Sequence, residues 1–203
     1  MKRGARRLAV SILLAPAPVA HAQTPAPAPT SACVDGGRVV DLLEFADGSR
    51  VRVLERAGET FVYESISAKG AATTMVTTLG LVTHSAASAA GTVLFSWQGD
   101  TQGLSPFKEG ATHAMTGTLK RPDGTEAHVG AELHIGPSEV VEIVGCRYPV
   151  IKITTINTIN GNRSKVVRYF HEKSMLSLRT IVLQDLPDGT TREAVSFSVK
   201  ALN

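Results

Sequence analysis

Hydrophobic and polar residues alternate along most of the chain after residue 39. Val51 and Val53, for example, alternate with Arg50 and Arg52. Successive side chains of a β-strand point to opposite faces of a sheet, so a period of two indicates strands with one buried face. No segment of ten or more residues has the period near 3.6 that is typical of an amphipathic helix. The pattern therefore predicts an all-β domain.

Short turns separate these alternating segments. Asp47-Gly48, Pro122-Asp123-Gly124 and Asn160-Gly161-Asn162 supply residues that tolerate positive φ, as tight hairpin turns require. Ser85–Gly91 is rich in Ala and Ser and is expected to be a loop. The expected strands are Val39–Phe45, Arg50–Glu55, Thr60–Ser67, Ala72–Thr78, a segment with Val93, Phe95 and Trp97 on one face, Ala111–Lys120, Glu126–Ile135, Val140–Val144, Val150–Ile159, Lys165–Phe170, Met175–Leu183 and Glu193–Ala201.

Strands joined in this way form a meander with two edges if the sheet stays open. Unpaired edges promote aggregation, and closure or strong curling removes or shields them. We therefore expect a single antiparallel meander of about ten strands, curled into a barrel or half-barrel. Within it, Val150–Ile159 and Lys165–Phe170 should pair as a hairpin around Asn160-Gly161-Asn162.

The N-terminus has the features of an export signal. Cations at positions 2, 3, 6 and 7 precede the apolar run Leu8–Ala15, and Ala20-His21-Ala22 is a small-x-small cleavage site. An apolar run of about eight residues cannot span a bilayer, which needs roughly 20. We predict a cleaved signal peptide over residues 1–22, a Pro/Ala-rich linker over 23–32 and an all-β domain over 33–203. The predicted location is the periplasm or the extracellular space.

Cleavage changes the charge of the chain. The full sequence has 21 Lys and Arg against 18 Asp and Glu, but four of those cations and none of the anions lie in the signal. The remainder carries 17 cations against 18 anions, a net charge of −1. Because no basic cluster is left to neutralise a row of phosphates, nucleic acid is not an expected partner. No later segment is long and apolar enough to be a transmembrane helix.

The chain has two cysteines, Cys33 and Cys146. An even number in an exported protein favours a disulfide. Two alternatives remain, a pair of free buried thiols and a lipoprotein acylated at Cys33. Thr30, however, stands where a lipobox normally has Leu. We predict the Cys33–Cys146 disulfide.

The sequence carries no recognisable motif for catalysis, cofactor binding or metal binding. There is no Gly-x-Ser-x-Gly elbow, phosphate-binding loop or dinucleotide fingerprint, and no cofactor is predicted. His128, Glu132 and His134 share one face of a strand, but the two histidines lie about 20 Å apart if it is extended. His113 on the neighbouring strand falls on the apolar face. No metal site is therefore predicted.

The aromatic residues Phe95, Trp97 and Phe107 form the candidate ligand site. The chain has one Trp, and it shares a strand face with Phe95. The loop Gly99–Gly110 follows and contains Phe107. One interpretation is a core cluster beneath a capping loop. The other is an apolar pocket with the loop as a lid, because β-barrels bind small molecules at their mouths and long loops often cover sites.

Residues 140–179 resemble a known family. The segment contains Gly145-Cys146-Arg147-Tyr148, the Asn160-Gly161 turn, Val167-Arg168-Tyr169-Phe170 and Leu178-Arg179. It is similar to the periplasmic TapB-like β-proteins of unknown function, which place a Gly-aromatic strand before a hairpin and a Tyr-rich strand. More distantly, the expected architecture resembles LolA-type lipoprotein carriers, whose curved sheet wraps around helices. Neither resemblance supplies a catalytic residue.

These observations favour a non-enzymatic envelope protein. It is expected to bind an apolar or amphiphilic ligand, or an envelope protein, within a curved sheet. Two alternatives stay open: a structural or adhesion module that acts through a sheet edge, and a hydrolase whose site is assembled from distant residues. A continuous apolar cavity would favour the first function, and three hydrogen-bonded polar groups in a cleft would favour the hydrolase.

Overall fold

The computed structural model describes residues 40–99, 101, 103–143, 145–185 and 191–202, and the signal peptide, the linker and Cys33 lie outside them. Apart from one 3-10 turn, Glu172–Ser174, the regular structure in this part of the chain is entirely strand. Among the described residues, no helix has the length and apolar character needed to cross a membrane. The strands are β1 (Leu42–Phe45), β2 (Arg50–Ala57), β3 (Thr60–Ile66), β4 (Ala72–Thr78), β5 (Val82–Ser88), β6 (Gly91–Gln98), β7 (Thr112–Lys120), β8 (Glu126–Ile143), β9 (Cys146–Ile159), β10 (Asn162–His171), β11 (Leu176–Asp185) and β12 (Thr191–Leu202).

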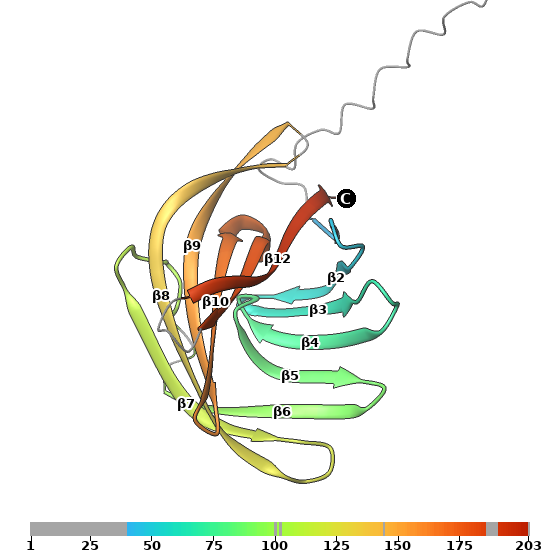
Figure 1. The fold of residues 1–203 in the computed structure, drawn as a ribbon, viewed down its shortest axis with the longest axis vertical. Helices are drawn as coiled ribbons and strands as arrows, with labels where there is room; N and C mark the ends of the chain where they lie inside the picture. Colours follow the sequence, from blue (N-terminus) through green and yellow to red (C-terminus); the bar gives the residue numbers. More distant parts are fainter. Residues whose placement is uncertain (1–39, 100, 102, 144, 186–190, 203) are drawn as a thin grey trace, which may run out of the picture. The chain divides into compact units, whose positions relative to one another are not determined.

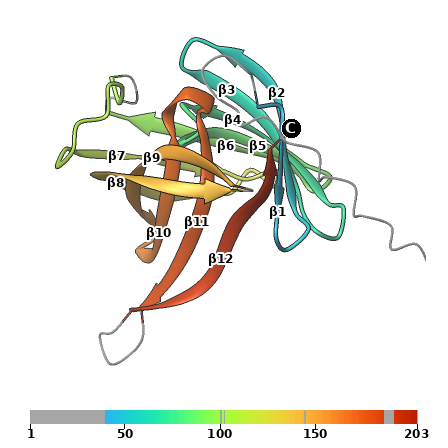
Figure 2. The ribbon, with the colours of Figure 1, turned by 90° about the horizontal axis from the view of Figure 1, so that it is seen from above.

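The strands form one closed antiparallel barrel in chain order (Figures 1 and 2). Each strand pairs with the strands before and after it, and β1 closes the ring by pairing with both β2 and β12. Leu43, for example, lies opposite Leu202 on β12 and Val51 on β2. The predicted all-β class and the curled meander are therefore confirmed, with twelve described strands where about ten were expected.

Two strand predictions need correction, and the first concerns Ser85–Gly91. Residues up to Ser88 belong to β5, which pairs with β4 and β6, instead of forming a loop. Ala and Ser are both small and differ little in polarity, so this stretch shows no clear alternation. Its strand conformation depends on hydrogen bonds to two neighbours that a local pattern does not reveal.

The second correction concerns Glu126–Ile135 and Val140–Val144, which were expected to be separate strands. They are parts of one 18-residue strand, β8, which curves together with β9 (Figure 1). The register shifts between Ile135 and Ser138. Pro137 lies within this irregularity, where its missing N–H costs the ladder least. A turn signal in the sequence thus produced a bulge, not a chain reversal.

The hairpin predicted around Asn160-Gly161 is confirmed. The pairing of β9 with β10 begins with Ile159 opposite Asn162 and ends with Ile151 opposite Phe170. It has no register shift. Asn160 and Gly161 both have positive φ, 48° and 85°, as a two-residue turn between twisted strands requires. Asn160 also accepts a hydrogen bond from the backbone N–H of His128 at 3.0 Å, which fixes the turn against β8.

Among the described residues, buried side chains gather in three clusters. The largest holds Leu43, Phe61 and Tyr148 near the closing strands. A second holds Leu104, Leu133 and Phe170, with Trp97 and Phe107 packed against it. A smaller cluster contains Leu119, Ala127 and Val129 and also contacts Trp97 and Phe95. Trp97 therefore lies where two of the clusters meet.

Candidate ligand-binding cavity

Strand β6 places Phe95 and Trp97 together. Its residues alternate between partly buried and exposed, which puts both aromatic rings on the inner face. The two rings stack with centroids 6.0 Å apart and planes 11° apart. Trp97 Nε1 donates a hydrogen bond of 2.7 Å to the backbone oxygen of Thr83 on β5. This bond satisfies the indole N–H and fixes the ring's orientation.

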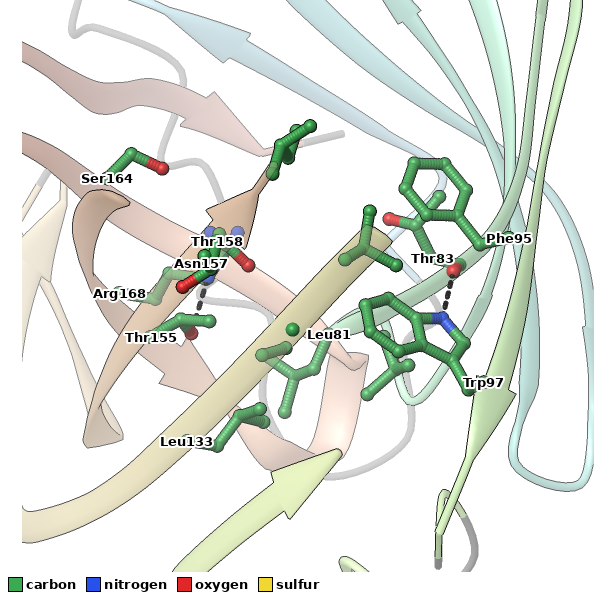
Figure 3. A pocket seen from close by; sticks show the side chains of 15 residues that line it. Leu81, Thr83, Phe95, Trp97, Leu133, Thr155, Asn157, Thr158, Ser164 and Arg168 are labelled. Carbon is green, nitrogen blue, oxygen red and sulfur yellow. Dashed lines mark hydrogen bonds between the residues drawn. The ribbon is translucent and has the colours of Figure 1, made fainter. Parts of the chain in front are cut away.

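These two rings line a cavity of about 260 Å³ (Figure 3). Its walls come from strands distant in sequence: β5, β6 and β8 supply one wall, and β9 and β10 supply the other. One part of the lining is apolar and includes Leu81, Phe95, Trp97 and Leu133. The remaining lining carries hydroxyl, amide and guanidinium groups, from Thr83, Thr155, Asn157, Thr158, Ser164 and Arg168.

A second cavity of the same volume adjoins the first. It is also about 260 Å³ and is lined by residues of β1 to β4 and β11, among them Phe61, Tyr63 and Met75. Leu81, Thr83 and Arg168 line both cavities. Small-molecule sites commonly measure about 300–1,000 Å³, and the two cavities taken together fall within that range. The residues that they share mark the place where they meet.

Arg168 is the charged residue common to the two cavities. Its Nη1 donates a hydrogen bond of 2.7 Å to Thr155 Oγ1 on β9. Burial lowers the pKa of Arg168, and the nearby Tyr63 phenol acts in the opposite direction. Burial likewise raises the pKa of Tyr63, so this phenol keeps its proton and remains a donor at neutral pH. The polar end of the site is therefore cationic and rich in donors.

The sequence hypothesis named Phe95, Trp97 and Phe107 as ligand-binding residues, and the structure brings only two of them to the cavity. Phe107 is not among its lining residues. The Phe107 ring packs edge-on against Phe170 with centroids 5.4 Å apart. Leu104 from the same loop is fully buried in that cluster. Phe107 is thus partly buried against a core cluster, and it does not enter the site proposed below.

Sequence reasoning missed Arg168 and Tyr63. In β10 the alternation places Arg168 on the same face as Val166 and Phe170. A cation between two apolar residues of one strand face is a local signal of an interior charge. Because β10 carries charges on both faces, Lys165 and Arg168 among them, the pattern does not single out Arg168.

His128, Glu132 and His134, the polar residues that share one face of β8, line neither of the two cavities. His134 Nε2 contacts Glu132 Oε1 at 2.9 Å, and His134 Nδ1 lies 3.2 Å from the Thr112 hydroxyl. This chain of carboxylate, imidazole and hydroxyl has the order of a catalytic triad, but its members are exposed or half-exposed and line neither interior cavity. A triad also needs a substrate cleft and oxyanion donors. In the described part of the chain, no cluster of three His, Cys, Asp or Glu side chains could hold a metal ion.

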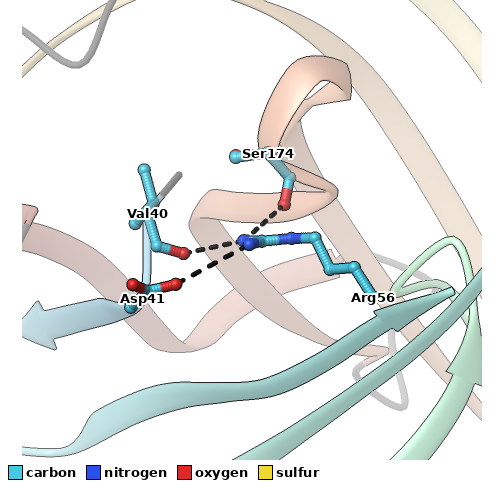
Figure 4. A network of polar contacts seen from close by, with 4 residues as sticks. All are labelled: Val40, Asp41, Arg56 and Ser174. Atoms are coloured by element: carbon cyan, nitrogen blue, oxygen red, sulfur yellow. Dashed lines mark hydrogen bonds and ion pairs between the residues drawn. The ribbon is translucent and has the colours of Figure 1, made fainter. Parts of the chain in front are cut away.

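A second arginine, Arg56, is half-buried and is held by contacts with its neighbours (Figure 4). Arg56 Nη2 donates to the backbone oxygens of Val40 at 2.7 Å and Ser174 at 3.4 Å, and Nη1 lies 3.8 Å from Asp41 Oδ1. The guanidinium also stacks over the Phe61 ring at 5.3 Å. These contacts tie β2 to the start of β1 and to the turn after β10. Arg56 is thus held by its neighbours, whereas Arg168 faces open space.

Cys146 is buried in the largest core cluster at 5% exposure. It is not a free cysteine. Cys33 lies outside the described residues, so the Cys33–Cys146 pairing stays a prediction. The signal peptide and linker also lie outside them and stay predictions.

Comparison with known proteins adds little to this description. No model of a known family matches the sequence, and no curated protein matches it. The resemblance of residues 140–179 to TapB-like proteins therefore stays a prediction. A search of solved structures finds the hypothetical lipoprotein YmcC from Escherichia coli K12, with a TM-score of 0.46, 13% identity, and coverage of 79% of this chain and 82% of that one. At this identity and TM-score, the likeness carries no inference about the function of this chain.

Proposed function

We propose that this protein is an exported, non-enzymatic barrel that binds a small apolar or amphiphilic molecule in its interior. The observation that carries the proposal is the pair of adjoining cavities, one of them lined by the stacked Phe95 and Trp97 rings. Concave sites with mostly apolar walls and a few placed polar groups are typical of ligand binding. A core at native packing density leaves few voids larger than a water molecule, so cavities of this size favour a binding site over a packed core.

The test uses Trp97, which is the one tryptophan of the chain. Titration with a neutral amphiphile, dodecanol, should change its emission with saturation and raise the melting temperature, because the ligand binds the folded state. Ala131→Leu, which fills part of the cavity wall, should weaken binding at least tenfold. Ala114→Leu is the matched control, because Ala114 is exposed on β7 and should leave binding unchanged. Absence of any saturable response would overturn the proposal.

The two alternative functions receive less support. An adhesion module acting through a sheet edge needs unpaired strands, and each of the twelve described strands has a partner on both sides. A hydrolase needs its hydrogen-bonded polar groups in a cleft, and the chain of Thr112, His134 and Glu132 lies outside the interior cavities.

A further inference from the structure

Strand β10 carries Arg168 into the interior between two neighbouring strands. Its backbone pairs with Ile153 of β9 and Thr180 of β11. The strand ladder fixes the Cα position on both sides, and the hydrogen bond to Thr155 fixes one end of the guanidinium. Figure 3 shows Arg168 and Thr155 across the cavity from Phe95 and Trp97. The cation is therefore held in place on the opposite wall from the aromatic rings.

The charge of Arg168 lacks a balancing anion in the described part of the chain. No described carboxylate lies within 4.0 Å of it, although four Lys or Arg side chains in this part of the chain pair with a carboxylate. A guanidinium has five N–H donors, and Thr155 accepts from Nη1 alone. Burial of an uncompensated charge is costly in a folded protein. An interior cation with unused donors facing a cavity is what an anionic ligand requires.

The cavity lining separates by polarity along the same direction. The wall from β5, β6 and β8 is mostly apolar, with Leu81, Trp97 and Leu133. The wall from β9 and β10 is polar around Arg168, with Thr155 and Ser164. A molecule with an apolar body and a charged head matches both walls at once. A wholly apolar ligand would leave the guanidinium with Thr155 as its hydrogen-bond partner and without a balancing anion.

We propose that the ligand is a single-chain anionic amphiphile, an aliphatic carboxylate whose head binds Arg168 and whose chain lies against Phe95 and Trp97. The inference rests on the proposed function and specifies its ligand class. A planar carboxylate matches the guanidinium through two parallel hydrogen bonds, and Tyr63 can donate from the second cavity. Two adjoining cavities of about 260 Å³ each suit one chain better than the two chains of a phospholipid.

The experiment compares three probes of equal chain length: dodecanoate, dodecanol and dodecyltrimethylammonium. Binding is followed by Trp97 emission and by calorimetry, below the critical micelle concentrations. Dodecanoate should bind at least tenfold more tightly than dodecanol, and the cationic probe should bind most weakly. The contact with Arg168 is expected to be buried, and buried charges are screened less than exposed ones. The preference for dodecanoate over dodecanol should therefore decrease less with rising salt than the binding of an anion to a surface cation does.

Arg168→Gln should abolish the preference and bring dodecanoate to the affinity of dodecanol. Arg52→Gln is the matched control, because Arg52 is exposed and paired with Glu64 at 2.7 Å, and it should leave the preference intact. Arg168→Gln should also raise the melting temperature of the ligand-free protein, since it removes an uncompensated buried charge. A merely structural arginine would instead lower it.

The outcomes separate this inference from the proposed function. If dodecanol and dodecanoate bind with equal affinity to the wild type, the cavity binds amphiphiles but the anionic assignment is wrong. If Arg168→Gln retains the preference for dodecanoate, the assignment to Arg168 is wrong. If none of the probes binds, the proposed function fails first. A diacyl phosphatidylglycerol that binds more tightly than dodecanoate would overturn the single-chain assignment.

Discussion

Single glycines decide how closely neighbouring strands approach in the wall beside the site. Gly117 on β7 lies opposite Trp97 on β6. A Cβ at position 117 would collide with the backbone oxygen of Ser96 and lie 3.0 Å from the Trp97 Cα. Gly130 on β8 differs. A Cβ added at position 130 would lie 3.7 Å from its nearest neighbour, the Met115 backbone oxygen, which is an ordinary van der Waals contact.

We therefore expect Gly117→Ala to lower the free energy of unfolding by about 1–3 kcal/mol, the usual range for overpacking. Gly130→Ala should change it by about 0.5 kcal/mol or less, as is typical of substitutions that disturb no contact. Urea unfolding followed by Trp97 emission measures both values. Equal stability of the two variants would show that β6 and β7 can separate without cost.

The stability of the fold should depend on pH through His171. This side chain is 6% exposed, and its Nδ1 lies 2.9 Å from the Ser174 hydroxyl. Burial first, and the nearby Lys173 second, lower the pKa of His171 in the folded state. The unfolded chain then binds the proton at a higher pH, near the ordinary value of about 6.5. The contribution of His171 to folding stability is therefore fully present above that pH and is lost as the pH falls towards the folded pKa.

The corresponding measurement is the free energy of unfolding between pH 8 and pH 5. His171→Gln should lower stability at all pH values but should flatten the decline below about pH 6.5. His128→Gln is the control, because His128 is exposed, and it should keep the decline. A decline of the same steepness in His171→Gln would assign the effect to other groups.

At the scale of elements, turns and bulges position the walls of the cavity. The two-residue turn between β9 and β10 sets the register that brings Thr155 beside Arg168. The register shift in β8 lies between Ile135 and Ser138. The part of β8 before the shift lines the cavity, and the part after it contributes Ile143 to the core cluster near the closing strands. Each element thus serves the site through its geometry as well as through its side chains.

We expect Gly161→Val to destabilise the β9–β10 hairpin. Gly161 has φ of 85°, and a β-branched residue in the left-handed region costs roughly 1–2 kcal/mol. Gly161→Asn should cost less, because Asn enters that region more easily. Hydrogen exchange of the β9 and β10 amides, with urea unfolding, measures the effect. Equal losses in the two variants would point to side-chain size instead of backbone strain.

At the scale of the whole molecule, closure makes the interior. A single ring of strands encloses both cavities, and β1 completes it through its pairs with β2 and β12. Interior and exterior residues alternate along each strand of a barrel, so each wall contributes about half of its residues to the lumen. Residues far apart in sequence, such as Tyr63 and Arg168, become neighbours only in the closed ring.

The predicted disulfide acts at this scale, because Cys33 and Cys146 enclose most of the first two thirds of the domain. In the chain-entropy model, closing so long a loop stabilises the fold by about 4–5 kcal/mol. Reduction should therefore lower the melting temperature and slow migration on a non-reducing gel. A Cys33→Ser/Cys146→Ser double variant is the control, since reductant should not affect it. Quantitative labelling of two free thiols in the oxidised protein would contradict the pairing.

Much of the fold could be predicted from local sequence pattern. Alternation located most of the strands, and the Asn160-Gly161 turn set the register of a hairpin, because both depend on the intrinsic preferences of neighbouring residues. Ser85–Gly91 was missed because Ala and Ser do not differ enough in polarity to alternate visibly. Pro137 was misread as a break because a bulge and a turn use the same residue types.

The candidate site could be predicted only in part. By itself the sequence determined the all-β class, the meander and the shared strand face of Phe95 and Trp97, since these follow from residues near one another in the chain. Only the tertiary structure decided that Phe107 packs on Phe170 and that Arg168 faces a cavity with Tyr63. These are contacts between distant strands, and they depend on the curvature and closure of the sheet, which no local pattern specifies.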